Sequence, residues 1–100
     1  MIRHICMFKL KEKAEGKSKA ENLETAVRKL KALYDLPGVI RAQVATNSPL
    51  TPESNYDLCL IFDFNDADAL NAYQEHPRHA EFGAFIVKVR ESRACIDYAF

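Results

Sequence analysis

The segment Ile2–Leu10 alternates between two sets of side chains, and both sets contain apolar residues. A period of two residues is typical of a β-strand. One face of such a strand usually packs against helices, so the apolar side chains of the other face need a cover as well. This need constrains the possible folds more than any other feature of the chain. One face carries Ile2, His4, Cys6, Phe8 and Leu10, and the other carries Arg3, Ile5, Met7 and Lys9.

Two further segments, Val39–Thr46 and Tyr56–Phe64, alternate in the same way and are predicted as the second and third strands. Tyr56–Phe64 is the most apolar segment, so we place it centrally in a sheet. Asn47–Asn55 is predicted as a polar loop, because its two prolines prevent regular structure. Lys11–Lys17, with Gly16 and five charges, is predicted as a solvated loop.

The first helix is predicted to begin at Ser18-Lys-Ala-Glu21, which is a capping box. Apolar residues then recur at steps of three and four as far as Tyr34, which is typical of a helix with one buried face. Leu36-Pro-Gly38 ends this helix.

Pro77 separates two predicted helical segments in the second half of the chain. Its ring cannot continue a helix from the residues before it, but it suits the first position of a new one. We therefore predict a short helix from Ala67 to about Glu75, a hinge or N-cap at His76, and a second helix from Arg78 to about Val89. Ser92–Phe100 alternates and is predicted as the fourth strand.

The predicted order of strand, helix, strand, strand, helical segment, strand is the split βαβ arrangement of a ferredoxin-like α+β fold. All 100 residues then form one domain, with both helices on one face of a four-stranded antiparallel sheet. The other face would be bare and apolar. A symmetric homodimer that packs sheet on sheet would cover it.

The overall charge argues against two classes of partner. Fourteen basic and fourteen acidic residues cancel, so no net field attracts nucleic acid or an anionic membrane. The N-terminal residues lack the apolar core of a signal peptide, no segment is long enough to span a membrane, and we expect a cytoplasmic protein. The three cysteines are widely spaced and do not indicate a disulfide framework or a zinc site, so we expect small buried side chains.

The segment Tyr73-Gln-Glu-His-Pro-Arg-His79 carries the clearest potential chemistry, because it holds two of the three histidines and a tyrosine. His79 would lie in the first turn of the second helix, where the helix dipole favours a neutral imidazole. A neutral imidazole can accept a proton.

The chain resembles the stress-responsive alpha/beta barrel domain family, also called Dabb, over essentially its whole length. This resemblance implies a ferredoxin-like protomer that pairs into a dimeric barrel, and it implies no assigned activity and no cofactor. The matching motifs are His4-Ile-Cys-Met-Phe-Lys9, Leu36-Pro-Gly38, Tyr56-Asp-Leu58, Tyr73 with His76-Pro-Arg-His79, and Arg93 with Asp97-Tyr98.

Site residues are implied by the resemblance to a cofactor-free plant polyketide cyclase of this family. Its base histidine falls on His79, its carbonyl-orienting tyrosine on Tyr73, its strand-one pocket histidine on His4, and the aspartate beside the base on Asp97. A further pocket histidine of that enzyme falls on Leu58, so the same substrate is not implied. In such a site His79 would abstract a proton next to a carbonyl, Asp97 would hold its other ring nitrogen, and Tyr73 would donate to the enolate oxygen.

Three hypotheses remain open at this point: an acid–base enzyme, a protein that binds a small carbonyl or phenolic compound without turnover, and a structural dimer whose histidines are architectural. The first two predict a cavity between the open sheet face and the segment Tyr73–His79, with His4, His76, Leu58 and Phe82 as binding residues. The third predicts that Phe82, Phe85 and Leu58 fill this space. We expect Arg93 to pair with a carboxylate. A metal site of His4, His76 and His79 is a weaker alternative, because no nearby carboxylate or thiolate completes it.

Overall fold

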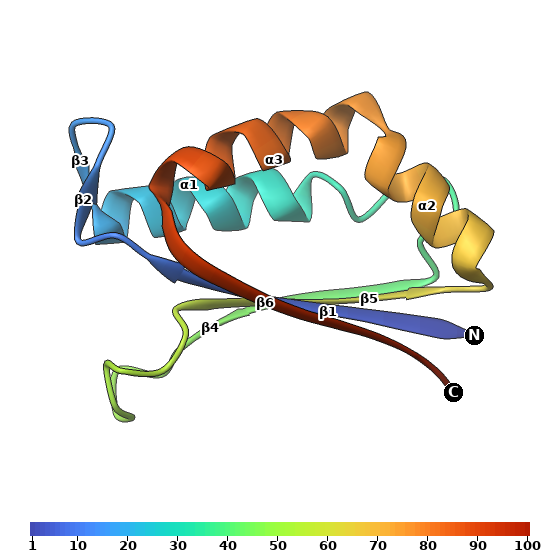
Figure 1. The fold of residues 1–100 in the computed structure, drawn as a ribbon, viewed down its shortest axis with the longest axis horizontal. Coiled ribbons are helices and arrows are strands. Elements are labelled where there is room, and N and C mark those ends of the chain that lie inside the picture. Colours follow the sequence, from blue (N-terminus) through green and yellow to red (C-terminus); the bar gives the residue numbers. More distant parts are fainter.

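The computed structural model describes residues 1–100, and its order of elements follows the predicted ferredoxin-like arrangement (Figure 1). The strands are β1 (Ile2–Leu10), β2 (Lys13–Ala14), β3 (Lys17–Ser18), β4 (Arg41–Thr46), β5 (Leu58–Phe64) and β6 (Arg90–Ala99). The helices are α1 (Lys19–Lys31), α2 (Ala67–Glu75) and α3 (Pro77–Val89). None of these helices is long and apolar enough to cross a membrane.

The main sheet has the strand order β4-β5-β1-β6, and every neighbouring pair is antiparallel. The helices lie together on one side of this sheet, and no element covers the other side (Figure 1). Strand β6 is an edge strand, and its backbone continues pairing to the chain ends, where the Phe100 amide donates to the Met1 carbonyl. The predicted α+β fold and its one-sided helix layer are confirmed.

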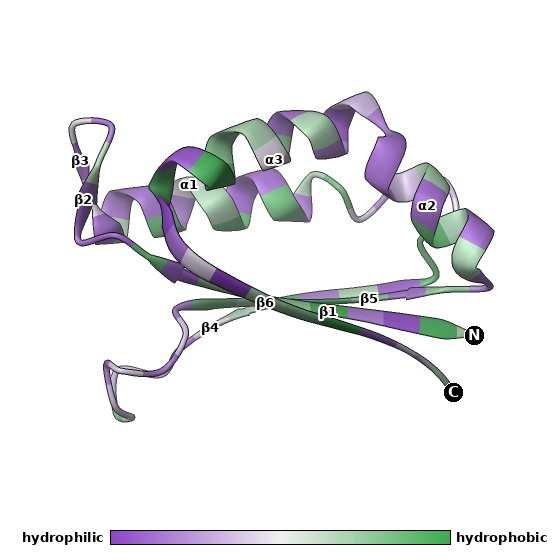
Figure 2. Cartoon of the chain, in the orientation of Figure 1, coloured by the Kyte–Doolittle hydropathy of each residue, from purple (hydrophilic) through white to green (hydrophobic).

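The core fills the space between the sheet and the helices. It includes Phe8, Phe62 and Phe64 from the strands, Leu30 from α1 and Ile86 from α3, all of which are buried. Hydrophobic and hydrophilic segments alternate along the strands and helices, as expected for elements that bury one face (Figure 2).

The capping residues place the helices where the sequence predicted them, with small differences at the ends. Ser18 and Glu21 form the capping box of α1. This helix ends at Lys31 rather than at Tyr34, and turns continue the chain as far as Gly38. His76 ends α2 and is also the N-cap of α3, where its ring Nδ1 accepts from the Arg78 amide at 3.1 Å.

One predicted loop contains regular structure. Within Lys11–Lys17 the chain forms a small hairpin in which β2 pairs with β3. Glu15 and Gly16 at its turn both have a positive φ, of 52° and 73°. This left-handed geometry suits the glycine.

The open side of the sheet carries a row of isoleucines, because Ile61, Ile5 and Ile96 are aligned across β5, β1 and β6. The Ile96 side chain is 60% exposed. Beside this row, the Arg3 guanidinium donates to both carboxylate oxygens of Asp63, at 2.8 and 3.0 Å. The face that the sequence predicted to be bare and apolar is therefore uncovered in the protomer.

Candidate functional site

A cavity of about 170 Å³ lies between the helix-covered side of the sheet and α3. The predicted position, at the open face of the sheet, is therefore wrong, because the cavity lies on the opposite, helix-covered side. The correction follows from strand alternation: His4 points toward the helices together with Cys6 and Phe8. The lining consists of His4, Cys6, Phe8, Leu60, Gln74, His79, Phe82, Gly83, Ile86, Val87, Arg90 and Arg93.

His4 is buried, and its ring is held by Asp97. The two residues are directly opposite each other in β1 and β6, and His4 Nδ1 lies 2.5 Å from Asp97 Oδ1. An ionised carboxylate can only accept, so the proton of a neutral His4 is on Nδ1. Its Nε2, which lies 3.5 Å from the Cys6 Sγ, is then left with a free lone pair. The prediction that Asp97 would hold His79 is wrong, because the strand register brings Asp97 to His4.

His79 lies in the first turn of α3, is partly buried, and lines the cavity. Burial lowers the pKa of His79, and electrostatic interactions with His4 and Arg93 lower it further. The backbone of Gln74 acts in the opposite direction. The net lowering of the pKa favours the neutral imidazole that a proton acceptor requires.

Tyr73 is 1% exposed and packs between His79 and the phenylalanines of β5. Its ring centroid is 4.8 Å from that of His79 and 5.0 Å from that of Phe64. The Tyr73 hydroxyl is buried and has no hydrogen-bond partner, and burial raises the pKa of Tyr73 well above its ordinary value. A buried hydroxyl without a partner is rare and costly. Tyr73 itself does not line the cavity, but it packs against the ring of His79, which does.

The other predicted binding residues occupy different places. Phe82 forms part of the cavity wall and packs edge-on against Phe8. Leu58 is buried in the core but does not line the cavity, and His76 serves as a helix cap. The space is therefore not filled in the way that the architectural hypothesis required. No group of three His, Cys, Asp or Glu side chains is placed to hold a metal ion, so the histidine trio does not assemble.

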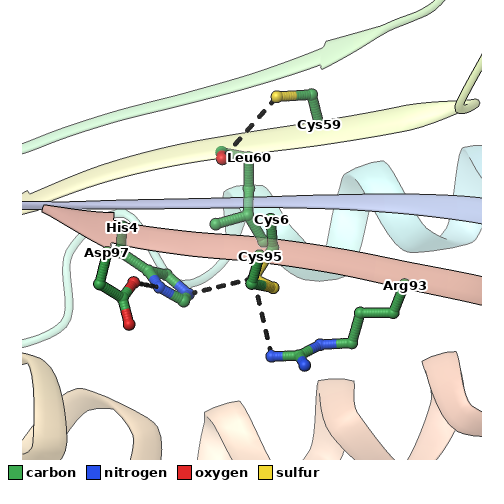
Figure 3. The surroundings of a disulfide bond; sticks show 7 residues. All are labelled: His4, Cys6, Cys59, Leu60, Arg93, Cys95 and Asp97. Atoms are coloured by element: carbon green, nitrogen blue, oxygen red, sulfur yellow. Dashed lines mark hydrogen bonds and ion pairs between the residues drawn. A yellow bond between two sulfur atoms is a disulfide. The ribbon is translucent and has the colours of Figure 1, made fainter.

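Cys6 and Cys95 form a disulfide, which contradicts the expectation of three free cysteines. They are opposite each other in β1 and β6, with Cα atoms 4.2 Å apart, although 89 positions separate them in the sequence. Figure 3 shows the bond on the helix side of the sheet between His4 and Arg93, while Cys59 points to the other side. Cys59 is free. Disulfides are typical of oxidising compartments, and this bond does not support the expected cytoplasmic location. That location stays a prediction.

Arg93 has no carboxylate partner, which contradicts the expectation of an ion pair. Its Nη2 instead lies 3.8 Å from the Cys6 Sγ (Figure 3). Arg90, three positions earlier in β6, also lines the cavity. The sequence analysis missed Arg90 and the cysteine pair as site residues. The alternation of Arg93, Cys95 and Asp97 indicates that these three residues share one face of a strand, but it does not identify their partners in β1.

Comparisons with known proteins agree with this architecture. A family model described as Stress responsive A/B Barrel Domain, or Dabb, matches residues 2–100. No match was found among curated proteins.

Solved structures of similar proteins share the fold. A dimeric protein of unknown function and ferredoxin-like fold from Bacteroides fragilis is 27% identical, with a TM-score of 0.85, and the match covers 99% of this chain and 95% of that one. A dimeric ferredoxin-like protein of unknown function from Thermobifida fusca is 25% identical, with a TM-score of 0.84 and coverage of 99% and 90%. A Dabb family protein from Mesorhizobium loti is 26% identical, with a TM-score of 0.73 and coverage of 99% and 95%.

Proposed function

The chain belongs to the stress-responsive A/B barrel (Dabb) family, and we propose that it binds a small carbonyl or phenolic compound in the cavity beneath α3. The observation that carries this proposal is the cavity itself, which joins an apolar wall to two imidazole rings. Ligand sites in proteins typically have this composition, in which mostly apolar surfaces surround a few polar groups.

The size of the cavity limits the ligand. An apolar cavity of about 150 Å³ is large enough to hold benzene. The 170 Å³ found here therefore accommodates one substituted ring or a short acyl chain. The rings of His4 and His79 would contact a carbonyl or hydroxyl oxygen of the ligand.

Gly83 allows a direct test of the cavity. It lines the space, and a Cβ added there would meet no atom within 4 Å. We expect Gly83→Leu to fill the cavity and to abolish the thermal stabilisation by phenol or 2-pentanone that the wild type shows. The stability of the unliganded protein should not fall, because leucine favours helix over glycine by up to about 1 kcal/mol.

Ala84→Leu is the matched control, since Ala84 is exposed on the same helix and does not line this cavity. A ligand-induced shift of the melting temperature in the wild type and in Ala84→Leu, but not in Gly83→Leu, supports the proposal. Equal shifts in all three proteins, or no shift with any phenol, ketone or aromatic acid, would contradict it.

A second candidate function is cofactor-free acid–base catalysis, and it is favoured by the His4–Asp97 pair together with a neutral His79. We propose His79 as the base, with the unpartnered Tyr73 hydroxyl as the donor to the developing enolate oxygen. His4, held by Asp97, would orient the carbonyl. The alternative in which the protein has no ligand is disfavoured by the open cavity.

Deuterium exchange tests this chemistry without knowledge of the natural substrate. The α-protons of 2-pentanone in D2O should disappear from the proton NMR spectrum faster with enzyme than in buffer. His79→Ala should slow the enzyme-dependent exchange by about 100-fold or more, the usual contribution of a general base. Exchange at the buffer rate with the wild type would leave only the binding function.

The open face of the sheet supports a further part of the proposal, a homodimer that packs sheet on sheet. The similar proteins from Bacteroides fragilis and Thermobifida fusca are described as dimeric. Burial of the row containing Ile5, Ile61 and Ile96 would remove apolar surface from water. Light scattering should give twice the mass of the chain for the wild type and the mass of one chain for Ile96→Glu, and a monomeric wild type would refute this packing.

A further inference from the structure

We propose that the natural ligand of the cavity is a small monocarboxylate, bound through its anionic group by Arg93. This inference rests on the proposed binding function and specifies the class of compound. Three features of the site carry it: an arginine without a carboxylate partner, a lining without acids, and an apolar wall in a cavity with the volume for one ring.

The first feature is the unpaired charge of Arg93. The ion pairs formed by arginines in this chain involve Arg3 and Arg78, and Arg93 forms none. Its guanidinium is directed instead toward the disulfide at the cavity (Figure 3). A disulfide sulfur carries no charge, so Cys6 in this state cannot serve as the counter-ion. A guanidinium lacking a counter-ion beside a partly apolar space gains most from an anionic ligand, which it can bind through two parallel hydrogen bonds.

The second feature is the charge of the whole lining. No aspartate or glutamate lines the cavity, whereas Arg90 and Arg93 both do. Asp97 is the acidic residue on the same side of β6, and its carboxylate is engaged by His4. The residues that line the cavity therefore offer positive charge only, and an anionic ligand would balance it.

The third feature is the apolar wall, which limits the rest of the ligand. Phe8, Leu60, Phe82 and Ile86 form this wall. A volume of about 170 Å³ leaves space for one aromatic ring or a short acyl chain beside the carboxylate. An anionic group placed on this wall, away from Arg90 and Arg93, would lose its hydration without compensation. The geometry thus selects an aromatic or keto monocarboxylate.

Three probes of similar size and different charge test this inference by calorimetry under non-reducing conditions: benzoate, benzyl alcohol and benzylamine. Benzoate should bind most tightly and benzylamine least. Arg93→Gln should weaken benzoate about 10- to 100-fold, as expected for loss of hydrogen bonds to a charged group, and leave benzyl alcohol unchanged. Arg93→Lys should retain part of the affinity because it keeps the charge but loses the planar fork.

Arg28→Gln is the matched control, because Arg28 is exposed on α1 and does not line the cavity. It should leave benzoate affinity unchanged. If benzyl alcohol binds as well as benzoate, or if Arg93→Gln and Arg28→Gln bind benzoate equally, the carboxylate inference is overturned while small-molecule binding stands. If no probe binds and Gly83→Leu changes nothing, both proposals fail.

Discussion

Reduction of the Cys6–Cys95 disulfide should lower the free energy of unfolding by about 4 to 5 kcal/mol. The bond joins residues 89 positions apart, so it closes a ring that contains nearly the whole chain. In the chain-entropy model a ring of 15 residues contributes about 3 kcal/mol and one of 100 residues about 4.7 kcal/mol. Domains of this size have a total stability of about 5–15 kcal/mol, so the loss would be a large fraction of the whole.

Urea unfolding with and without a phosphine reductant measures this loss, and Cys95→Ser should reproduce it in non-reducing buffer. Cys59→Ser is the control, because Cys59 is outside the bond and lies on the other side of the sheet. Its unfolding midpoint should respond to the reductant as the wild type does. Cys95→Ser should show no response.

Alkylation followed by mass spectrometry provides an independent check, since one cysteine should react in the denatured, non-reduced protein and three after reduction. Alkylation of all three cysteines before reduction would refute the bond. A bond confirmed by mass but worth less than about 1 kcal/mol would refute the chain-entropy reasoning, and would indicate that the reduced unfolded chain remains compact.

The remaining predictions concern groups whose polar atoms are buried. The pKa of Asp63 is lowered from its ordinary value of 3.8, chiefly by its hydrogen bonds to Arg3. The ionised Asp63 therefore stabilises the fold fully above pH 3.8. This stabilisation is lost as the pH falls from 3.8 through the lowered pKa. Asp63→Asn should therefore lower stability at pH 7 by about 1.5–3 kcal/mol and flatten the acid limb of a stability–pH curve; an equally steep limb would contradict this pairing. Tyr73→Phe removes a hydroxyl that has no protein partner, so urea unfolding should show unchanged or increased stability, and a loss above about 1 kcal/mol would reveal a hidden partner.

The sequence predicted the elements well because their signals are local. The capping box at Ser18, the break at Pro77 and the alternation in Ile2–Leu10 each act over a few residues, and the structure confirms them. The predicted length of α1 was too great. The helical spacing of apolar residues continues to Tyr34, but the backbone leaves the helix after Lys31.

The details of the site depend on pairing between distant segments. Whether Asp97 meets His4 or His79, and whether Cys95 meets Cys6, is decided by the register of β6 against β1. A shift of one residue would turn all of these side chains to the opposite face. No local pattern in the sequence determines this register, so the disulfide and the His4–Asp97 pair could not be predicted from it.

Strand β6 supplies Arg93, Cys95 and Asp97 to the site and contributes no residue to the buried core. The polar groups that β6 brings to the site are thus separate from the side chains that pack the core. Of these three residues, Arg93 can be exchanged without loss of the disulfide, which needs Cys95, or of the contact to the buried His4, which needs Asp97. New ligand preferences are therefore accessible through Arg93 at little cost in stability. For protein engineering, the cavity-facing side of this edge strand is therefore a place where ligand preference could be altered while the buried core stays unchanged.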